Sequence, residues 1–260
     1  PPPPPPPQPI VNGNDARPDT WPWQAALFYF KKQLCGASLL DERHVVTAAH
    51  CLDSEPSDYT LMLGSIEKSS EASGNLFTNR ASFIQVQNFT VHPNYTSFCY
   101  YWGNDIAILR LATPVRFNRA LSPVCLIDPQ YDVITTSSIC YALGWGLTNF
   151  YNSTSDATIL QVAKLKLWSW DECRKTNFFI SPSMICAGYT GGIIANCKGD
   201  SGGPLVCRNS ISSGSSSINS FSPWRLVGVF TFLSTGCDVV MKPSVFTNVS
   251  YHSQWLKSAM

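Results

Sequence analysis

The chain has 260 residues, of which 44% are hydrophobic and 13% are charged, and its formal net charge at pH 7 is +1. This length suits one large all-β domain or two smaller ones with a substantial core. The balanced charge, with no basic stripe and no acidic tail, excludes nucleic acid as an expected partner. Every apolar stretch is much shorter than the roughly 18 residues that a membrane helix needs, so no membrane span is expected in this chain.

Residues 1–9 form a proline run that is broken only by Gln8. Such a run lacks backbone donors and adopts an extended polyproline helix. We expect a stiff tether or a propeptide remnant, and the alternative is a ligand for a proline-binding domain. The sequence starts at Pro1 without an apolar signal region, so we expect a processed or truncated product whose signal peptide was lost upstream.

Short apolar runs alternate with turn residues from Trp21 onward, which is typical of strands. The expected strands cover residues 24–30, 36–40, 44–48, 59–63, 83–89 and 105–111 in the first half, and residues 138–143, 161–167, 184–187, 204–208, 225–232 and 245–249 in the second. A helix is expected over residues 251–260, where it would bury Trp255 and Leu256. About twelve short strands with few helical periods predict an all-β protein of two six-stranded antiparallel barrels with a short C-terminal helix.

Ten cysteines and four glycosylation sequons indicate an oxidising environment. The cysteines do not form paired C-x-x-C motifs, which argues against structural zinc, and we expect no metal. The candidate glycosylation sites are Asn88, Asn94, Asn152 and Asn248. These features predict a secreted, extracellular protein.

The segment Gly199-Asp200-Ser201-Gly202-Gly203-Pro204 has the character of a nucleophile turn. Glycines tolerate the strained backbone that presents a serine hydroxyl outward. They also leave the backbone N–H groups of Gly199 and Ser201 free to bind a carbonyl oxygen, as an oxyanion hole does. A glycine-rich turn with a bystander serine is the structural alternative.

Two upstream motifs weaken that alternative. They are Thr47-Ala48-Ala49-His50-Cys51 and Asn104-Asp105-Ile106-Ala107-Ile108-Leu109. With Ser201 they give histidine, aspartate and serine in chain order. A lone histidine in an apolar run is more often structural than catalytic, so the inference rests on the joint appearance of all three.

With Ile10-Val11-Asn12-Gly13 and Gly144-Trp145-Gly146, these motifs make residues 10–260 resemble the chymotrypsin-like (trypsin-fold) serine protease family. The resemblance implies that Ser201 is the nucleophile, His50 the general base and Asp105 the group that orients the imidazole. It implies a secreted endopeptidase that works through an acyl-enzyme without a cofactor, and protein or peptide partners as substrates or inhibitors. It also implies a barrel over residues 10–122 that carries His50 and Asp105, and a barrel over residues 123–260 that carries Ser201 and the primary pocket.

The resemblance further implies that activation cleavage frees Ile10, whose ammonium then pairs with Asp200. A buried ion pair of this kind can act as a switch. The sequence departs from the family where Pro9 precedes Ile10, since most zymogens of the family carry Arg or Lys there. Three interpretations stay open: an artificial N-terminus, an unusual activating protease, or a chain that remains a zymogen.

Cysteine pairing cannot be deduced from sequence alone. The resemblance implies the disulfides Cys35–Cys51, Cys140–Cys207, Cys173–Cys186 and Cys197–Cys237. Cys99 and Cys125 are left over. They could bond to each other, or Cys125 could bond an upstream propeptide or domain, as its counterpart does in many relatives.

The resemblance places the primary pocket at Ala195, Asn196, Thr231, Phe232, Leu233 and Ser244. Ala195 stands where trypsin-like members hold an Asp, so cleavage after Lys or Arg is not expected. Leu233 and Ser244 replace wall glycines, which narrows the pocket as in elastase-like members. We therefore predict a preference for small or medium apolar residues before the scissile bond. The alternative is that Leu233 turns aside and the pocket accepts Leu, Met or Phe.

A second hypothesis of a different class is a catalytically silent, zymogen-like scaffold or binding module on a proline tether. Pro9 and the unusual strand around Phe232 motivate it, whereas the complete set of His50, Asp105 and Ser201 favours an enzyme. The remaining histidines, His44, His92 and His252, lie in no such motif and are expected at the surface.

Overall fold

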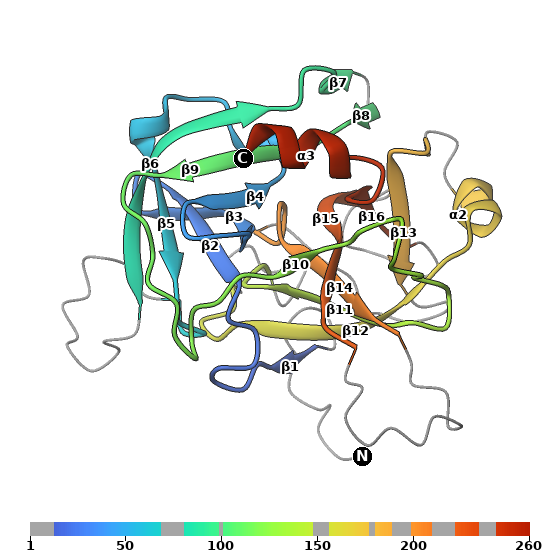
Figure 1. Cartoon of the computed structure of the whole chain (residues 1–260), viewed down its shortest axis with the longest axis horizontal. Coiled ribbons are helices and arrows are strands. Elements are labelled where there is room, and N and C mark those ends of the chain that lie inside the picture. Colours follow the sequence, from blue (N-terminus) through green and yellow to red (C-terminus); the bar gives the residue numbers. More distant parts are fainter. Residues whose placement is uncertain are drawn as a thin grey trace, which may run out of the picture.

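The computed structural model of this chain consists of two β-barrels packed side by side (Figure 1). The structure describes residues 13–68, 81–98, 101–147, 156–176, 180–188, 199–209, 222–233 and 243–260, and only the backbone of residues 97, 98, 101, 102, 232 and 233. Within these ranges the prediction of two six-stranded antiparallel barrels and a C-terminal helix is confirmed.

The first barrel is closed in the order β2-β3-β4-β9-β6-β5. Its strands are β2 (Gln24–Tyr29), β3 (Lys32–Leu39), β4 (His44–Thr47), β5 (Tyr59–Leu63), β6 (Ser82–Val91) and β9 (Ala107–Leu111). All six were expected, although β3 begins earlier than predicted because it forms a tight hairpin with β2 in which Tyr29 pairs with Lys32. The buried faces of these strands enclose an aliphatic core that contains Leu27, Leu61 and Leu109.

The second barrel has the neighbour order β12-β11-β14-β15-β16-β13, and pairing of β12 with β13 closes it. Its strands are β11 (Ile139–Gly144), β12 (Gln161–Leu167), β13 (Met184–Gly188), β14 (Pro204–Arg208), β15 (Arg225–Leu233) and β16 (Ser244–Asn248). Short strands that the sequence did not indicate are β1 (Asn14–Asp15), β7 (Thr96–Phe98), β8 (Tyr101–Gly103) and β10 (Cys125–Leu126). The pairing of β10 with β15 is parallel.

Four short helices lie within the described ranges. They are η1 (Ala49–Cys51), η2 (Pro56–Asp58), α2 (Trp170–Thr176) and α3 (Ser253–Ala259), of which α3 lies within the expected C-terminal helix and buries Leu256. Helix α2 was not expected, but Ser169 and Glu172 form a reciprocal capping box at its start. Within the described ranges, no helix is long and apolar enough to cross a membrane.

Three of the four implied disulfides lie among the described residues, and all three are formed. Cys35–Cys51 joins β3 to η1, Cys140–Cys207 joins β11 to β14, and Cys173–Cys186 joins α2 to β13. The implied Cys197–Cys237 pair lies outside the described residues, as does Cys99. Cys125 is an exposed free thiol, so it does not form the bond to Cys99 that the sequence left open.

The four sequons differ in their surroundings. Asn88 on β6 and Asn94 beyond it are exposed, whereas Asn248 on β16 is partly buried. The side-chain nitrogen of Asn248 donates a hydrogen bond to the backbone oxygen of Pro182 at 3.3 Å. Asn152 lies outside the described residues.

Candidate active site

His50, in the short helix η1 that follows β4, forms a pair with Asp105, which lies just before β9. The backbone N–H of His50 donates to Asp105 Oδ1 at 2.9 Å, and His50 Nδ1 lies 2.7 Å from Asp105 Oδ2. The side chain of Asp105 is fully buried, while that of His50 is 16% exposed. An ionised carboxylate can only accept, so Nδ1 carries the shared proton and Nε2 is left as the basic nitrogen.

Asp105 has a further donor that the sequence did not indicate. The hydroxyl of Thr231 on β15 donates to Asp105 Oδ2, and the hydroxyl of Thr247 on β16 donates to the Asp105 backbone oxygen at 2.8 Å. Both threonines are buried. The sequence places Thr231 on the expected pocket strand, and the structure adds a contact to Asp105. The sequence signal was weak, namely a hydroxyl residue in an otherwise apolar strand.

The turn that carries Ser201 is packed against the segment that leads to His50. The backbone oxygen of Ser201 accepts the N–H of Gly36 on β3 at 2.7 Å. Gly202 has a left-handed φ of 76°, and a Cβ at this position would lie 2.5 Å from the Gly36 oxygen and 3.1 Å from the Ala48 nitrogen. Only glycine combines this backbone with this close approach. The serine turn of the second barrel therefore meets the histidine segment of the first.

The residue before the serine is held by the Gly-Trp-Gly motif. The carboxylate of Asp200 is buried and accepts the N–H of Gly146 at 2.8 Å. A Cβ on Gly144 would lie 2.8 Å from the carboxyl carbon of Asp200, so these glycines make room for the carboxylate. Ile10, whose ammonium the resemblance implies as a partner of Asp200, lies outside the described residues.

The turn between the two candidate oxyanion donors is also anchored. Gly199 has a φ of 93°, and its backbone oxygen accepts a hydrogen bond from Gln33 Nε2 at 3.0 Å. The N–H of Gly203 donates back to the oxygen of Asp200 at 2.9 Å. These bonds occupy the carbonyl groups of the turn, so its shape is fixed from both barrels.

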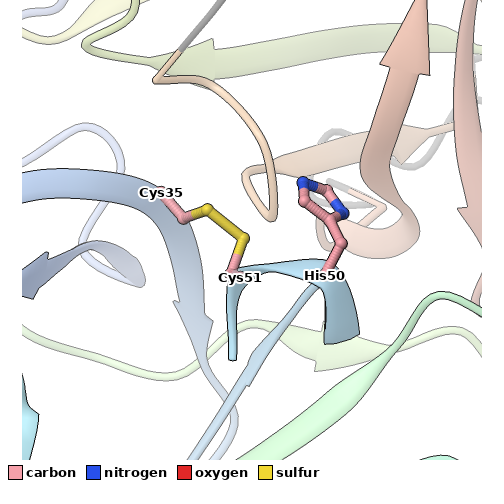
Figure 2. Close-up of side chains that lie close together, drawn as sticks. All are labelled: Cys35, His50 and Cys51. Atoms are coloured by element: carbon pink, nitrogen blue, oxygen red, sulfur yellow. A yellow bond between two sulfur atoms is a disulfide. The ribbon is translucent and has the colours of Figure 1, made fainter. Parts of the chain in front are cut away.

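A disulfide lies beside the histidine (Figure 2). Cys51 directly follows His50, and its bond to Cys35 ties η1 to β3. The two sulfur atoms and a ring nitrogen of His50 lie within 4.8 Å of one another, which resembles a metal-binding cluster. Because both sulfur atoms are in the disulfide, neither is a thiolate that could bind a metal ion. The bond instead restrains the helix that carries His50.

The candidate pocket residues are only partly described. Ala195 and Asn196 lie outside the described residues, and the side chains of Phe232 and Leu233 are not described. Ser244 is buried on β16 and pairs with Leu233 on β15. The structure thus places two of the expected wall positions on adjacent strands.

The expectation that the remaining histidines lie at the surface was wrong for His44 and His252. His44 is 9% exposed and its Nδ1 lies 2.8 Å from the carboxylate of Asp41. Burial alone would raise the pKa of Asp41, but hydrogen bonds from the backbone of Arg43 and from the His44 side chain and backbone lower it overall. His252 is only 2% exposed. Both rings are buried because polar partners lie within reach of their nitrogen atoms.

The two joined barrels, the buried aspartate–histidine pair and the glycine-bounded serine define a serine protease of the two-barrel class. Residues 10–256 match the family profile described as Trypsin, so the chain belongs to the trypsin family of serine proteases, which are hydrolases. It is similar to the solved structure of mouse neuropsin, a serine protease expressed in the limbic system of the brain. The two share 29% sequence identity with a TM-score of 0.78, over 95% of this chain and 98% of that one.

Proposed function

We propose that this chain is an endopeptidase in which Ser201 attacks the peptide carbonyl while His50 accepts the proton of its hydroxyl. The contact between Asp105 and His50 Nδ1 carries this proposal, because it directs the basic Nε2 away from the carboxylate. The hydroxyl of Ser201 is unreactive unless a base removes its proton during attack. Asp105 would then stabilise the imidazolium, and His50 would return the proton to the leaving amine.

The developing oxyanion would bind to the backbone N–H groups of Gly199 and Ser201. Anchoring of this turn by Gln33 and Gly36 supports the role, since oxyanion donors act best when they are fixed before the reaction. The acyl-enzyme on Ser201 would be hydrolysed by water along the same path. No step requires a cofactor.

For specificity, we propose small or medium apolar residues before the scissile bond. The support is the replacement of the acidic pocket base by Ala195 and of wall glycines by Leu233 and Ser244. One methylene in an apolar pocket is worth about 1–3 kcal/mol, so the preference would be graded rather than absolute.

We also propose the organisation of the precursor. Residues 1–9 would be a tether, residues 10–122 the barrel that carries His50 and Asp105, and residues 123–260 the barrel that carries Ser201. Activation would pair the Ile10 ammonium with Asp200, and the exposed thiol of Cys125 would bond an upstream segment. The disulfides are typical of secreted proteins, and we propose an extracellular location.

The test uses protein that begins at Ile10, compared with its Ser201→Ala variant. A fluorophosphonate probe should label the first protein and not the second, and equal labelling would refute the role of Ser201. Peptide libraries that vary the residue before the cleaved bond then report specificity. Fastest cleavage after Ala or Val supports our proposal, whereas fastest cleavage after Phe or Lys contradicts it. Absence of labelling in both proteins would instead favour the silent scaffold.

A further inference from the structure

A chain of hydrogen bonds centred on the buried His252 ring runs from the end of β16 to the residue before Asp105. The His252 ring lies between two oxygen atoms, with Nδ1 2.8 Å from the backbone oxygen of Asn248 and Nε2 3.0 Å from Asn104 Oδ1. At the far side, Asn104 Nδ2 donates to the backbone oxygen of Asn94 at 2.9 Å. The chain therefore ends on a backbone carbonyl at both sides.

The backbone carbonyl groups at the two ends of this hydrogen-bonded chain determine how many protons it needs. A backbone carbonyl only accepts, so Asn104 must direct its amide nitrogen to Asn94 and its oxygen to His252. The ring then faces an acceptor at each nitrogen. A neutral imidazole has one N–H and satisfies one of them, whereas an imidazolium satisfies both. Protonation of His252 therefore supplies a donor to each of the two acceptors that face the ring.

The neighbouring histidine does not take that proton. The rings of His92 and His252 pack edge to face with their centroids 5.0 Å apart. His92 Nδ1 accepts the backbone N–H of Asn94 at 3.2 Å, which requires a lone pair and favours the neutral ring. Burial also lowers the pKa of His92. Of the two rings, His252 is the one whose partners favour the charged form.

Other titratable groups near the ring are turned elsewhere. Among the described residues, Tyr251 packs against the His252 ring but is itself 60% exposed. Asp105 directs its carboxylate to His50, as described above. In α3, Lys257 reaches Asp128 at 3.4 Å. No described carboxylate therefore stabilises a charged His252, and its carbonyl partners must do so.

The surroundings of the His252 ring shift its protonation to acidic pH. Burial lowers the pKa of His252, the Asn248 carbonyl raises it, and the nearby His92 lowers it, with a net lowering. The ring is therefore neutral above the ordinary histidine range and takes up its proton below that range. Because the folded protein disfavours this charge, stability is full above the ordinary pKa of about 6.5 and declines as the pH falls below it.

Asn104 connects the hydrogen-bonded chain to the candidate active site. Its φ is 54°, in the left-handed region, and its backbone oxygen accepts the N–H of Ile106 at 2.8 Å. Asp105 is thus the middle residue of a tight turn whose first residue is fixed by its side chain. We propose that His252 is a positioning residue for Asp105 that acts through Asn104, and that protonation of the ring tightens this restraint. The inference rests on the proposed catalytic role of Asp105.

The first experiment compares kcat and KM of the wild type, His252→Gln and His252→Phe from about pH 5 to about pH 8. Glutamine places an N–H donor near Nε2 at every pH, and phenylalanine has no donor. Dividing one profile by another removes the part of the pH dependence that the proteins share. We expect the wild-type to His252→Gln ratio of kcat to rise about fivefold as the pH falls, since one hydrogen bond is worth about 1 kcal/mol. The ratio of KM should stay constant.

We expect His252→Phe to have a kcat about fivefold below that of His252→Gln at every pH, for the same reason. A pH-independent ratio between the wild type and His252→Gln would overturn the proposal. Thermal unfolding of each variant separates a kinetic effect from loss of folded protein.

The second experiment does not depend on turnover. In the Ser201→Ala background, NMR titration of the His252 ring is compared with and without Asn104→Gly, which removes the acceptor but tolerates the left-handed backbone. We expect the His252 pKa to fall further in the Asn104→Gly variant, because the charged ring loses one partner. An unchanged pKa would refute the hydrogen-bonded chain, whatever the outcome for the catalytic role of Ser201.

Discussion

Replacing Thr231 by valine should slow this protease while leaving its fold intact. The buried carboxylate of Asp105 accepts from the His50 backbone, from His50 Nδ1 and from the Thr231 hydroxyl. Valine has nearly the same shape, so β15 keeps its packing and one of three donors is lost. A hydrogen bond to a charged group is worth about 1.5–3 kcal/mol. At 1.4 kcal/mol for each factor of ten, kcat/KM should fall about 10- to 150-fold.

The assay is kcat/KM on a small apolar peptide substrate, with active-site titration to count competent enzyme. Thr231→Ser is the matched control, because it keeps the hydroxyl and removes only a methyl group. We expect it to retain most of the activity at a cost in stability of about 1 kcal/mol. If Thr231→Val matched the wild type within twofold, the donor would have no role in orienting Asp105, and the reasoning from the hydrogen-bond set would fail.

Three further predictions concern other parts of the chain. Gly202→Ala should lower labelling by a fluorophosphonate at least about a hundredfold, because a Cβ there meets the backbone oxygen of Gly36 and moves the serine; normal labelling would contradict the packing. Peptide mass spectrometry should find glycan on the exposed Asn88 but not on Asn248, whose side-chain nitrogen is bonded to a backbone carbonyl; the reverse pattern would be inconsistent with the structure. In the cleaved full-length precursor, Cys125→Ser should release the upstream segment on a non-reducing gel, and its retention would exclude the proposed bond.

The sequence could predict the fold because its signals are local and repeated. Alternation along residues 83–89 and the apolar runs of the other strands reflect burial on a barrel wall, and each was found as a strand within a few residues. Helix α2 was missed because it spans only Trp170–Thr176 and has one buried residue, so it lacks a helical period. Its capping box at Ser169 was the available signal.

The residues of the candidate site also differ in whether a local sequence signal marks them. His50, Asp105 and Ser201 could be proposed from the sequence because each lies in a short motif with its own composition. Thr231 and His252 were not recognised as partners because their contacts span long sequence separations, 126 residues for Thr231 and Asp105 and 148 for His252 and Asn104. Nothing in the residues around either position reports a partner that only the closed barrels bring near.

These long-range contacts explain why the two barrels must act as one unit. Asp105 belongs to the first barrel segment, yet Thr231 and Thr247 of the second barrel bind its side chain and its backbone. Ser201 belongs to the second barrel, yet Gly36 of the first fixes its backbone. Each half thus supplies proposed catalytic groups whose orientation is set by the other half. A shift between the barrels of even about 1 Å would disturb Ser201 and Asp105 together, and misplacement of that size can cost about a hundredfold in rate. The catalytic geometry is therefore a property of the barrel junction, and any partner or modification that loosens the junction should lower kcat before it unfolds either barrel.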